Sequence, residues 1–463
     1  MPQGMFAAMP HQVELFADLY ELRMAHAYRQ LGMHDEAVFS LFVRRLPPRR
    51  NYLLACGVED LLDTLEMLRF GTESLDYLRS IGEFPAAFLE WLAGFRFSGA
   101  VHALAEGTPV FAEEPILEIA APIAEAQIIE TLTMNMVGLQ TLLASKAVRV
   151  VTAAAGRPVV DFGSRRAQGV DAAVAGARAF YLAGVTASSN LLAGARHGIP
   201  VAGTMAHSFV QAFDNEAQAF RAFARLYPET ILLVDTYDTP EGVRRVTELA
   251  AALGGDFRVR GVRLDSGDLL ALSREARNIL DVAGLRHVQI FASGGLDEDK
   301  IAALLAAGAP IDAFGVGTDM SVSGDAPALD IAYKLTSYAG DGRTKLSPGK
   351  RILPGRKQLF RRMAGGIAEG DVIARAGETS EHRPLLRMVM QDGRRLHPRP
   401  SLPQSRADAA AQIGTLPAPL RSLGAAVPPY PVAISEALDA YAAEIYRAVR
   451  GAAQQGKTGQ RGA

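Results

Sequence analysis

The sequence predicts an α/β fold: an incomplete or modified (β/α) barrel with an N-terminal α+β domain and a small C-terminal β/helix extension. From residue 157 onward, short apolar segments alternate with amphipathic ones, which is typical of a parallel sheet with helical crossovers. About six or seven such units follow one another, fewer than the eight of a complete barrel. Polar residues gather where the predicted strands end, and sites of such folds form there.

Composition is that of an ordinary globular protein. The chain has 463 residues, 49% hydrophobic and 21% charged, with a formal net charge of -2. We therefore expect no bulk attraction to nucleic acid or membranes. The single cysteine, Cys56, excludes an internal disulfide and a cysteine zinc cluster and favours a reducing, cytoplasmic setting. No apolar run is long enough to cross a membrane, and we see no secretion signal.

The sequence predicts four regions: an N-terminal α+β domain at 1–125, a barrel-like catalytic domain at 126–345, a C-terminal extension at 346–450 and a disordered tail at 451–463. We expect the N-terminal domain to be shared with part of the C-terminal region. In the first, helical spacing predicts helices over 13–32, 58–71 and 85–95, with extended pieces around a Pro-Pro turn at 36–57 and a β unit at 97–120. A long buried helix is expected over 123–156.

The barrel elements follow in order. Expected strands, each leading into its helix or loop, cover 157–163, 198–207, 230–238, 257–268, 287–295 and 310–320, with a possible further strand at 331–338. Expected helices cover 167–184, 215–227, 240–255, 269–284 and 297–308. In the extension, 347–362 is basic and loop-like, 369–378 and 383–395 suggest short strands, and 432–450 predicts an amphipathic helix.

Two glycine-rich loops follow late strands: "SGGLDE" at 293–298 and "GVGTD" at 315–319. Glycine lets backbone amides approach a phosphate, and a following helix N-terminus adds partial positive charge. Two such loops on adjacent late strands match the barrel phosphate site. Tight turns are the alternative.

Charged residues also stand at the ends of two other predicted strands. Arg165 and Arg166 in "DFGSRRAQG" match phosphate or carboxylate oxygens, or form a surface ion pair. In "RLDSGD", Arg263 precedes Asp265 and Asp268; the two carboxylates could hold a ribose diol or anchor Mg²⁺ through water, while Asp265 could instead cap a helix.

His207 stands where a predicted strand meets a helix, in "GTMAHSF". A lone histidine is often a satisfied core residue. Here Asp235 ends the next strand, and we expect it to hold one ring nitrogen and leave the other as a base or nucleophile.

Taken together, these residues resemble the nicotinate phosphoribosyltransferase family, a type II phosphoribosyltransferase family. Nine stretches carry the resemblance in the family's order: "ADLYELRM", "EGTPVFAEEPIL", "DFGSRRAQG", "GTMAHSF", "VDTYDT", "GVRLDSGDL", "FASGGLDE", "FGVGTD" and "PGRKQ". The resemblance implies transfer of phosphoribosyl from phosphoribosyl pyrophosphate to nicotinate, giving nicotinate mononucleotide and pyrophosphate. It also implies coupling to ATP hydrolysis through a phosphohistidine at His207, oriented by Asp235, with Mg²⁺ required.

The resemblance assigns binding roles as well. Phe162 covers one face of the nicotinate ring, and Tyr20 from a second subunit covers the other, so a homodimer is expected. Arg165 faces anionic groups of the substrate. Arg263 and Asp265 hold the ribose and pyrophosphate region. The 5′-phosphate lies among the two glycine loops, to which the remaining substrate-binding candidates belong: Ser293, Gly294, Gly295, Gly315, Gly317 and Thr318.

The pyridine substrate depends on one position. A related nicotinamide enzyme carries an aspartate where the ring amide docks, and an aspartate would repel a carboxylate. In the matching stretch "VTASSNLLAG" we place neutral Ser189 there, which favours nicotinate; a nicotinamide phosphoribosyltransferase is the alternative.

Two other classes compete. A barrel sugar-phosphate aldolase or isomerase would use the same phosphate loops, but a Schiff-base aldolase needs a strand-end lysine, and Lys334 is the nearest. A non-catalytic metabolite-binding protein is the third possibility. The basic stretch with Lys345, Lys350, Arg351, Arg356 and Lys357 is either a solvated loop or a lid over ATP or pyrophosphate.

Overall fold

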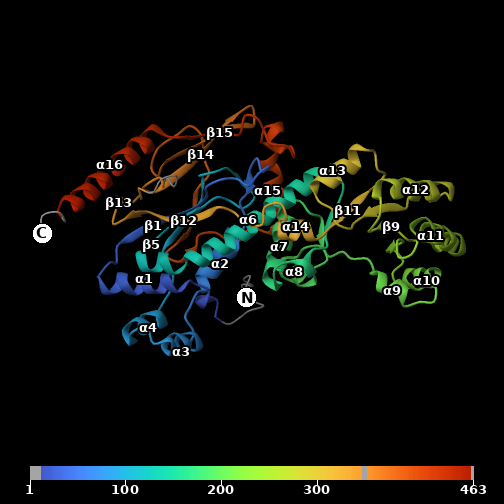
Figure 1. Ribbon diagram of the computed structural model, residues 1–463, viewed down its shortest axis with the longest axis horizontal. Coiled ribbons are helices and arrows are strands. Elements are labelled where there is room, and N and C mark those ends of the chain that lie inside the picture. Colours follow the sequence, from blue (N-terminus) through green and yellow to red (C-terminus); the bar gives the residue numbers. More distant parts are fainter. Residues whose placement is uncertain (1–11, 347–351, 460–463) are drawn as a thin grey trace. The chain divides into compact units, whose positions relative to one another are not determined.

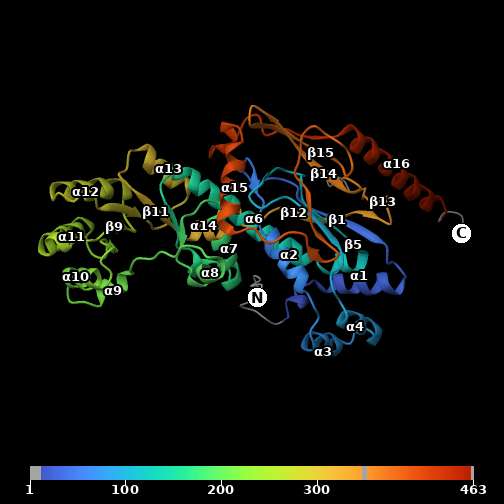
Figure 2. The same cartoon turned by 180° about the vertical axis from the view of Figure 1, so that it is seen from behind.

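The structure is a computed structural model that describes residues 12–346 and 352–459. It divides into two compact units: Lys146–Pro327, and the described parts of Met1–Ser145 together with Ala328–Ala463. Figures 1 and 2 show the elements of both units from opposite sides. A search of the described residues finds no helix whose length and apolar character would let it span a membrane.

The unit Lys146–Pro327 is built on a six-stranded sheet in which all neighbouring strands are parallel. The strand order is β7 (Ala187–Ser188), β6 (Val159–Asp161), β11 (Ala313–Val316), β10 (Gln289–Ala292), β9 (Gly261–Leu264) and β8 (Ile231–Leu233). Most of their residues are buried, as expected of parallel strands covered by helices. With β7 and β8 as its two ends, the sheet is an incomplete barrel, and the predicted fold class is confirmed.

Helices follow the strands of this unit. They are α7 (Val170–Leu182), α8 (Leu191–His197), α9 (His207–Gln211), α10 (Glu216–Leu226), α11 (Thr239–Leu253), α12 (Leu269–Val282), α13 (Glu298–Ala306) and α14 (Thr318–Val322). Side chains cap several of them: Asp238 accepts from Glu241 N, and Asp268 accepts from Leu270 N and Ala271 N. The cap of α12 is therefore Asp268, and Asp265 is not used for it.

One predicted strand is wrong. Segment 198–207 contains no strand of the sheet; Val201 makes only an isolated bridge to Ser188, and the sheet strand here is β7. Pro200 has no N–H to donate to a strand partner. Its carbonyl accepts from Ser188 N at 3.0 Å, and the pairing stops after Ala202 N donates to the Ser188 carbonyl.

The other unit contains a seven-stranded sheet in the order β13 (Asp341–Gly342), β12 (Ile331–Tyr338), β1 (Glu36–Val43), β5 (Pro115–Pro122), β3 (Ala100–Ala103), β17 (Arg387–Gln391) and β18 (Arg394–Arg395). A four-stranded sheet has the order β16 (Arg383–Pro384), β14 (Lys357–Ala364), β15 (Ile367–Arg375) and β19 (Val432–Ile434), and β2 (Leu53–Leu54) pairs with β4 (Pro109–Val110). The possible further barrel strand at 331–338 is thus β12, which pairs antiparallel with β1.

Helices of this unit are α1 (Leu19–Gln30), α2 (Val58–Met67), α3 (Thr72–Ile81), α4 (Ala86–Ala93), α5 (Ile123–Ile128), α15 (Leu402–Gly414) and α16 (Glu436–Gly459). Short 3-10 helices cover Val13–Leu15 and Ala418–Arg421, with Ser164–Arg166 and Gly254–Asp256 in the barrel unit. The helix expected over 123–156 is α5 followed by α6 (Glu130–Ala153), whose last residues from Lys146 belong to the barrel unit.

Two C-terminal segments differ from expectation. The segment 347–362 was expected to be loop-like; residues 347–351 lie outside the described residues, and Lys357 begins strand β14. The tail 451–463 was expected to be disordered, yet α16 continues to Gly459, consistent with the high helix propensity of Ala and Gln in "GAAQQGK". Residues 460–463 lie outside the description.

Candidate functional site

Every predicted site residue except Tyr20 belongs to the barrel unit. Most of them follow the carboxyl end of a parallel strand, while Arg263 lies within β9 and Gly315 within β11. Phe162 and Arg165 follow β6, Ser189 follows β7, Asp235 follows β8, Asp265 follows β9, Ser293, Gly294 and Gly295 follow β10, and Gly317 and Thr318 follow β11. His207 is the first residue of α9. Since parallel strands end at the same edge of a sheet, these groups share one rim.

The imidazole of His207 lies between two neighbouring loops. Its Nδ1 is 3.2 Å from Thr236 Oγ1, within hydrogen-bond distance, and its Nε2 is 3.8 Å from Asp265 Oδ2. The expected contact with Asp235 is therefore replaced by one with Thr236, the next residue. The ring is partly exposed, so one nitrogen is held while the other faces a carboxylate at the rim.

Asp235 binds the loop after β9 instead of His207. Its Oδ2 accepts hydrogen bonds from Asp265 N at 3.0 Å and from Ser266 Oγ at 2.6 Å, which ties the loop after β8 to the loop after β9. Its Oδ1 is buried and has no hydrogen-bond partner within residues 12–346 and 352–459. A buried carboxylate oxygen without a donor is a position where a cation or a bound water fits.

Arg263 lies next to this pair. Its guanidinium donates to Thr204 Oγ1 and to the Met205 carbonyl at 3.2 Å, and its Nη2 is 3.5 Å from Asp265 Oδ1. Burial lowers the pKa of Arg263, the charges of Asp265 and Asp235 oppose that shift, and the charge of Arg165 adds to it.

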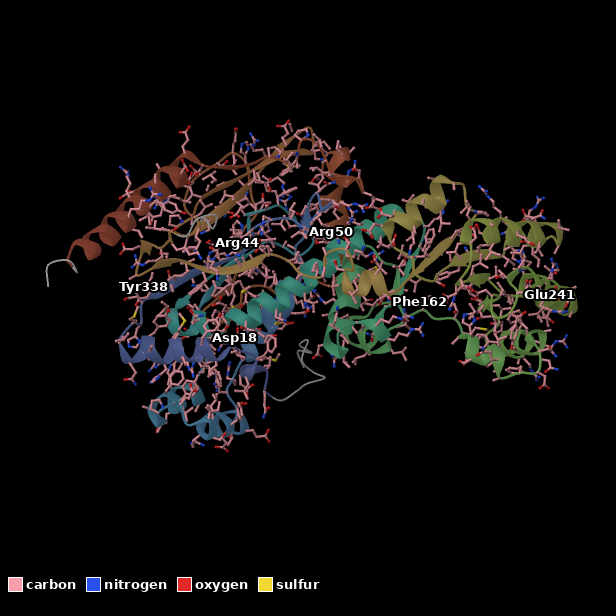
Figure 3. All side chains as sticks on the ribbon, viewed as in Figure 1. Asp18, Arg44, Arg50, Phe162, Glu241 and Tyr338 are labelled. Atoms are coloured by element: carbon pink, nitrogen blue, oxygen red, sulfur yellow. The ribbon has the colours of Figure 1, made fainter. Side chains whose placement is uncertain are left out.

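Phe162, labelled in Figure 3, lies directly after β6. Its ring packs against the buried cluster of Val160, Ala187 and Phe291, with a centroid distance of 5.8 Å to Phe291, and Arg263 Cζ lies 5.7 Å from its centroid. Gly315 makes this possible, since a Cβ there would stand 2.6 Å from the Phe162 ring. Gly315 was expected at the phosphate; inside β11 it instead leaves room for the ring.

The loop after β10 needs glycine for two reasons. Gly294 has a φ of +89°, and a Cβ there would stand 1.7 Å from the Asp265 carbonyl oxygen. Gly295 has a φ of +61°, and the nearest atom to a Cβ there would be Lys300 Nζ, at 3.9 Å. Ser293 Oγ donates to Asp265 Oδ1, so this loop is joined to the loop after β9. The two exposed glycines present their backbone at the rim without side chains that would keep an anion away.

The loops after β6 and β11 also meet. Arg166 donates to Thr318 Oγ1 at 3.1 Å, and Gly163 is so close to α14 that a Cβ there would overlap Ser321 Oγ. Arg165 is exposed and makes no hydrogen bond or ion pair with the described residues. Gly317 is the N-cap of α14. The guanidinium of Arg165 is thus available to a ligand at this rim.

Ser189 is exposed at the end of β7, and its N–H donates to the Asp161 carbonyl at 2.9 Å. The preceding Ser188 is buried and donates to Asp161 Oδ2 at 2.7 Å. Burial raises the pKa of Asp161, while hydrogen bonds from Ser188 and Gly163 oppose the shift. The side chain of Asp161 is therefore occupied beneath the rim, and the neutral Ser189 is at the surface.

A buried lysine joins the bases of both glycine loops. Lys146 Nζ, in α6, lies 2.5 Å from Glu298 Oε2, 2.5 Å from Asp319 Oδ2 and 2.9 Å from Asp325 Oδ1, and only 2% of its side chain is exposed. Arg149 Nε also binds Glu298 at 2.9 Å. Sequence analysis missed this cluster; two cations three residues apart in an apolar helix were the available signal, because buried charges must be paired.

Tyr20 belongs to the other unit, in α1. Its side chain is 44% exposed, and burial followed by the charge of Glu130 raises its pKa. The basic stretch 345–357 is not uniformly solvated: Lys357 Nζ is buried 3.0 Å from Glu118 Oε1, and Arg356 binds His102. Lys345 is exposed, while Lys350 and Arg351 lie outside the described residues.

Comparison with known proteins gives a consistent result. The family model described as the nicotinate phosphoribosyltransferase (NAPRTase) family matches residues 158–359, and those of the corresponding N-terminal and C-terminal domains match 15–138 and 374–441. Nicotinate phosphoribosyltransferase pncB2 of Mycobacterium tuberculosis is 56% identical over 431 residues, 93% of each chain. The Bacillus subtilis nicotinate phosphoribosyltransferase is 41% identical over 386 residues, 81% of this chain and 79% of its own. The crystal structure of human nicotinic acid phosphoribosyltransferase has a TM-score of 0.84 at 30% identity, covering 92% of this chain and 99% of that one.

Proposed function

The chain belongs to the nicotinate phosphoribosyltransferase family and is an enzyme of that kind, and from this premise we propose that it couples the transfer to ATP hydrolysis through a phosphorylated His207. The substrates are nicotinate and phosphoribosyl pyrophosphate, and the products are nicotinate mononucleotide and pyrophosphate. The observation that carries the proposal is the meeting of His207, Asp265, Arg263 and the glycine loop at one rim.

The transfer breaks the bond between ribose C1 and a pyrophosphate oxygen and forms one between C1 and the pyridine nitrogen. Positive charge develops at C1 and negative charge on the leaving group. Arg263 and Arg165 would stabilise the departing anion, and the backbone of Gly294 and Gly295 would hold the 5′-phosphate. Phe162 offers a flat apolar wall to the pyridine ring, worth about 0.5–1.5 kcal/mol beyond the area buried.

His207 has the geometry of an oriented nucleophile. Thr236 holds Nδ1 at 3.2 Å, which leaves Nε2 to attack the γ-phosphorus of ATP. The bond from that phosphorus to the β,γ-bridging oxygen breaks, ADP leaves, and water later releases phosphate from the imidazole. Asp265, 3.8 Å from Nε2, stabilises positive charge on the ring between these steps.

Magnesium fits the same region. Asp265 and the unpartnered Oδ1 of Asp235 are oxygen donors of the kind Mg²⁺ takes directly or through water. These donors are fewer than Mg²⁺ needs, so water and substrate phosphates would supply the remaining ligands. When bound, Mg²⁺ would supply charge neutralisation of the pyrophosphate.

Nicotinate is favoured over nicotinamide because Ser189 is neutral and Asp161 is buried with both its carboxylate oxygens hydrogen-bonded. The aldolase alternative requires a lysine at the end of a barrel strand. Lys334, the nearest candidate, lies in β12 of the other unit, where its Nζ is 3.7 Å from Glu130 Oε1. A homodimer in which Tyr20 completes the partner's site remains part of the proposal.

One assay tests the proposal. Pyrophosphate release from phosphoribosyl pyrophosphate is measured with nicotinate or nicotinamide, each with and without ATP, and protein labelling is followed with γ-³²P-labelled ATP. We expect nicotinate turnover stimulated by ATP and a label that His207→Ala abolishes. The control Ser208→Ala changes the adjacent exposed side chain and should keep the label.

Labelling that persists in His207→Ala, or turnover indifferent to ATP, would contradict the phosphohistidine while leaving the transferase intact. Turnover of nicotinamide as fast as nicotinate would contradict the role of Ser189.

A further inference from the structure

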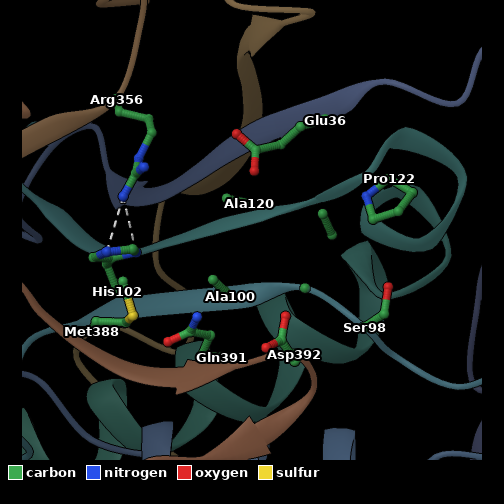
Figure 4. A pocket seen from close by; sticks show the side chains of 12 residues that line it. Glu36, Ser98, Ala100, His102, Ala120, Pro122, Arg356, Met388, Gln391 and Asp392 are labelled. Carbon is green, nitrogen blue, oxygen red and sulfur yellow. Dashed lines mark hydrogen bonds between the residues drawn. The ribbon is translucent and has the colours of Figure 1, made fainter.

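A hollow of about 330 Å³ lies in the unit that contains the seven-stranded sheet, and no part of the transferase mechanism uses it (Figure 4). Strands β1, β3 and β5 form its wall, with Glu36, Ala100, His102 and Ala120 among the lining residues. Its size is that of a small metabolite site.

One end of the hollow is basic. Arg356 Nη2 lies 2.9 Å from His102 Nε2, so the guanidinium donates to an imidazole nitrogen that must be unprotonated. Burial, followed by the charge of Arg356, lowers the pKa of His102. No ion pair joins Arg356 to a carboxylate in residues 12–346 and 352–459. Glu118, which influences His102, is already bound by Lys357 and Ser40.

An arginine whose partner is a neutral base lacks a counter-charge. A guanidinium fork matches the two oxygens of a carboxylate, and such charge-assisted pairs are the strong ones. An anionic group in the hollow would give Arg356 the partner that His102 does not supply, and His102 could then bind the same anion. The basic end is therefore complementary to a carboxylate.

The rest of the hollow has the opposite charge. Figure 4 shows the carboxylates of Glu36 and Asp392 directed toward the space, from opposite walls, with Gln391 beside Asp392. Glu36 begins β1, and Asp392 lies in the turn between β17 and β18. Neither makes an ion pair with the part of the chain that the structure describes. A ligand with two anionic groups would be repelled here, and one with two cationic groups would be repelled by Arg356.

We propose that this hollow binds a small zwitterion, with its carboxylate on Arg356 and His102 and its ammonium group between Glu36 and Asp392. Charge complementarity at both ends selects this class over dianions and dications of the same length. The binding is separate from nucleotide transfer and does not depend on the proposed function.

Three unbranched four-carbon probes separate the classes: 4-aminobutyrate, succinate and 1,4-diaminobutane. Binding to the full chain is measured by ligand-observed NMR titration. We expect 4-aminobutyrate to bind at least tenfold more tightly than either of the others. Arg356→Gln and Asp392→Asn should each lower the affinity for 4-aminobutyrate by about tenfold, which is the equivalent of one lost charge-assisted contact.

The variants also change the selectivity in opposite senses. Asp392→Asn should raise the affinity for succinate relative to that for 4-aminobutyrate. Arg356→Gln should raise the affinity for 1,4-diaminobutane relative to that for 4-aminobutyrate. Glu90→Gln, which removes an exposed carboxylate of α4 outside the hollow, serves as the matched control and should change nothing.

Any of three results overturns the proposal. The three probes bind with equal affinity, or 4-aminobutyrate does not bind even at about 50-fold the protein concentration, or neither variant changes its binding. Nicotinate turnover, measured on the same preparations, reports separately on the transfer site and on correct folding of the variants.

Discussion

Gly294 is the residue on which the geometry of the rim depends most sharply. Its Cβ position is filled by the Asp265 carbonyl, and its φ of +89° disfavours any side chain. Gly294→Ala should therefore separate the loops after β9 and β10, lower the free energy of unfolding by about 2 kcal/mol or more, and raise the KM for phosphoribosyl pyrophosphate at least tenfold. Urea unfolding and steady-state kinetics measure the two effects.

Gly295→Ala is the matched control for that change. Gly295 also has a positive φ, +61°, but the nearest atom to its Cβ position is Lys300 Nζ at 3.9 Å. Gly295→Ala should therefore lower the free energy of unfolding only through backbone strain, by about 1 kcal/mol. Equal effects of the two substitutions would mean that the contact with Asp265 does not matter.

At the residue scale, the sequence predicts which strand ends hold functional side chains, but it does not predict which partner each side chain contacts. Most rim residues follow from the strand pattern, because they lie directly after a strand of the parallel sheet; His207 is an exception, since no sheet strand precedes it in 198–207. Asp235 and Thr236 are neighbours, and only the path of the backbone after β8 decides that the threonine reaches His207. Likewise, Gly315 belongs to a glycine motif, but its contact with Phe162 depends on residues more than a hundred positions apart.

Among the elements, α6 determines how the glycine loops are placed. Lys146 binds carboxylates at the start of α13, in α14 and beyond it. Burial lowers the pKa of Lys146, but hydrogen bonds to Asp319 and Glu298 outweigh it, and the pKa is raised overall. The cluster is charged and paired, and removing the cation would leave the buried Glu298 beside two partly exposed carboxylates that repel it.

Lys146→Met should lower the free energy of unfolding by about 3–5 kcal/mol and raise the KM for phosphoribosyl pyrophosphate more than it lowers kcat. Lys146→Arg keeps the positive charge, so its free energy of unfolding and its KM for phosphoribosyl pyrophosphate should both be close to those of the wild type. The double variant Lys146→Met with Glu298→Gln should be more stable than Lys146→Met alone. A loss of stability with an unchanged KM in the folded fraction would limit Lys146 to a structural role.

Helix α1 contacts the start of α6 through a carboxyl group that is fully buried. Glu21 is 0% exposed and accepts from Thr131 N at 3.0 Å and from Thr131 Oγ1. Burial raises its pKa to about 7, with hydrogen bonds from Thr131 opposing and Glu130 adding to the shift. The protonated form is favoured in the folded state, so its contribution is present below about pH 4.5 and is lost as pH rises through about 7.

Glu21→Gln copies the protonated form and should remove this dependence. Between pH 5 and pH 8 the wild type should lose about 2–3 kcal/mol of stability that the variant keeps. Urea unfolding at several pH values gives the comparison, with Glu36→Gln as a control at an exposed carboxyl. Parallel pH profiles for wild type and Glu21→Gln would exclude Glu21 as the titrating group.

Element type follows from local pattern more closely than element partner does. Strand β12 is recognised from its alternating residues, yet it pairs antiparallel with β1, whose partner residues precede it by some 290 positions. Periodicity contains no information about that pairing. The predicted strand at 198–207 failed because a proline and two glycines interrupt what apolar content alone favours.

At the scale of the whole molecule, the proposal requires that the partner chain supplies Tyr20 to each site. Tyr20 belongs to one compact unit and His207 to the other, and the proposed dimer gives each site His207 from one chain and Tyr20 from its partner. Two variants, Tyr20→Ala and His207→Ala, test this when ATP-stimulated nicotinate turnover is measured, because each should lose that activity as a homodimer for a different reason.

Co-expression of the two variants distinguishes the arrangements. In a heterodimer, the site that takes His207 from the Tyr20→Ala chain receives an intact Tyr20 from the other chain, and it should work. Random pairing makes about half of the dimers mixed, each with one working site of two, so activity should return to about one quarter of wild type. If Tyr20 served its own chain, every site in the mixture would lack one group and no activity would return. Tandem affinity tags isolate the mixed dimer, whose activity should then approach half of wild type, because only one of its two sites is complete.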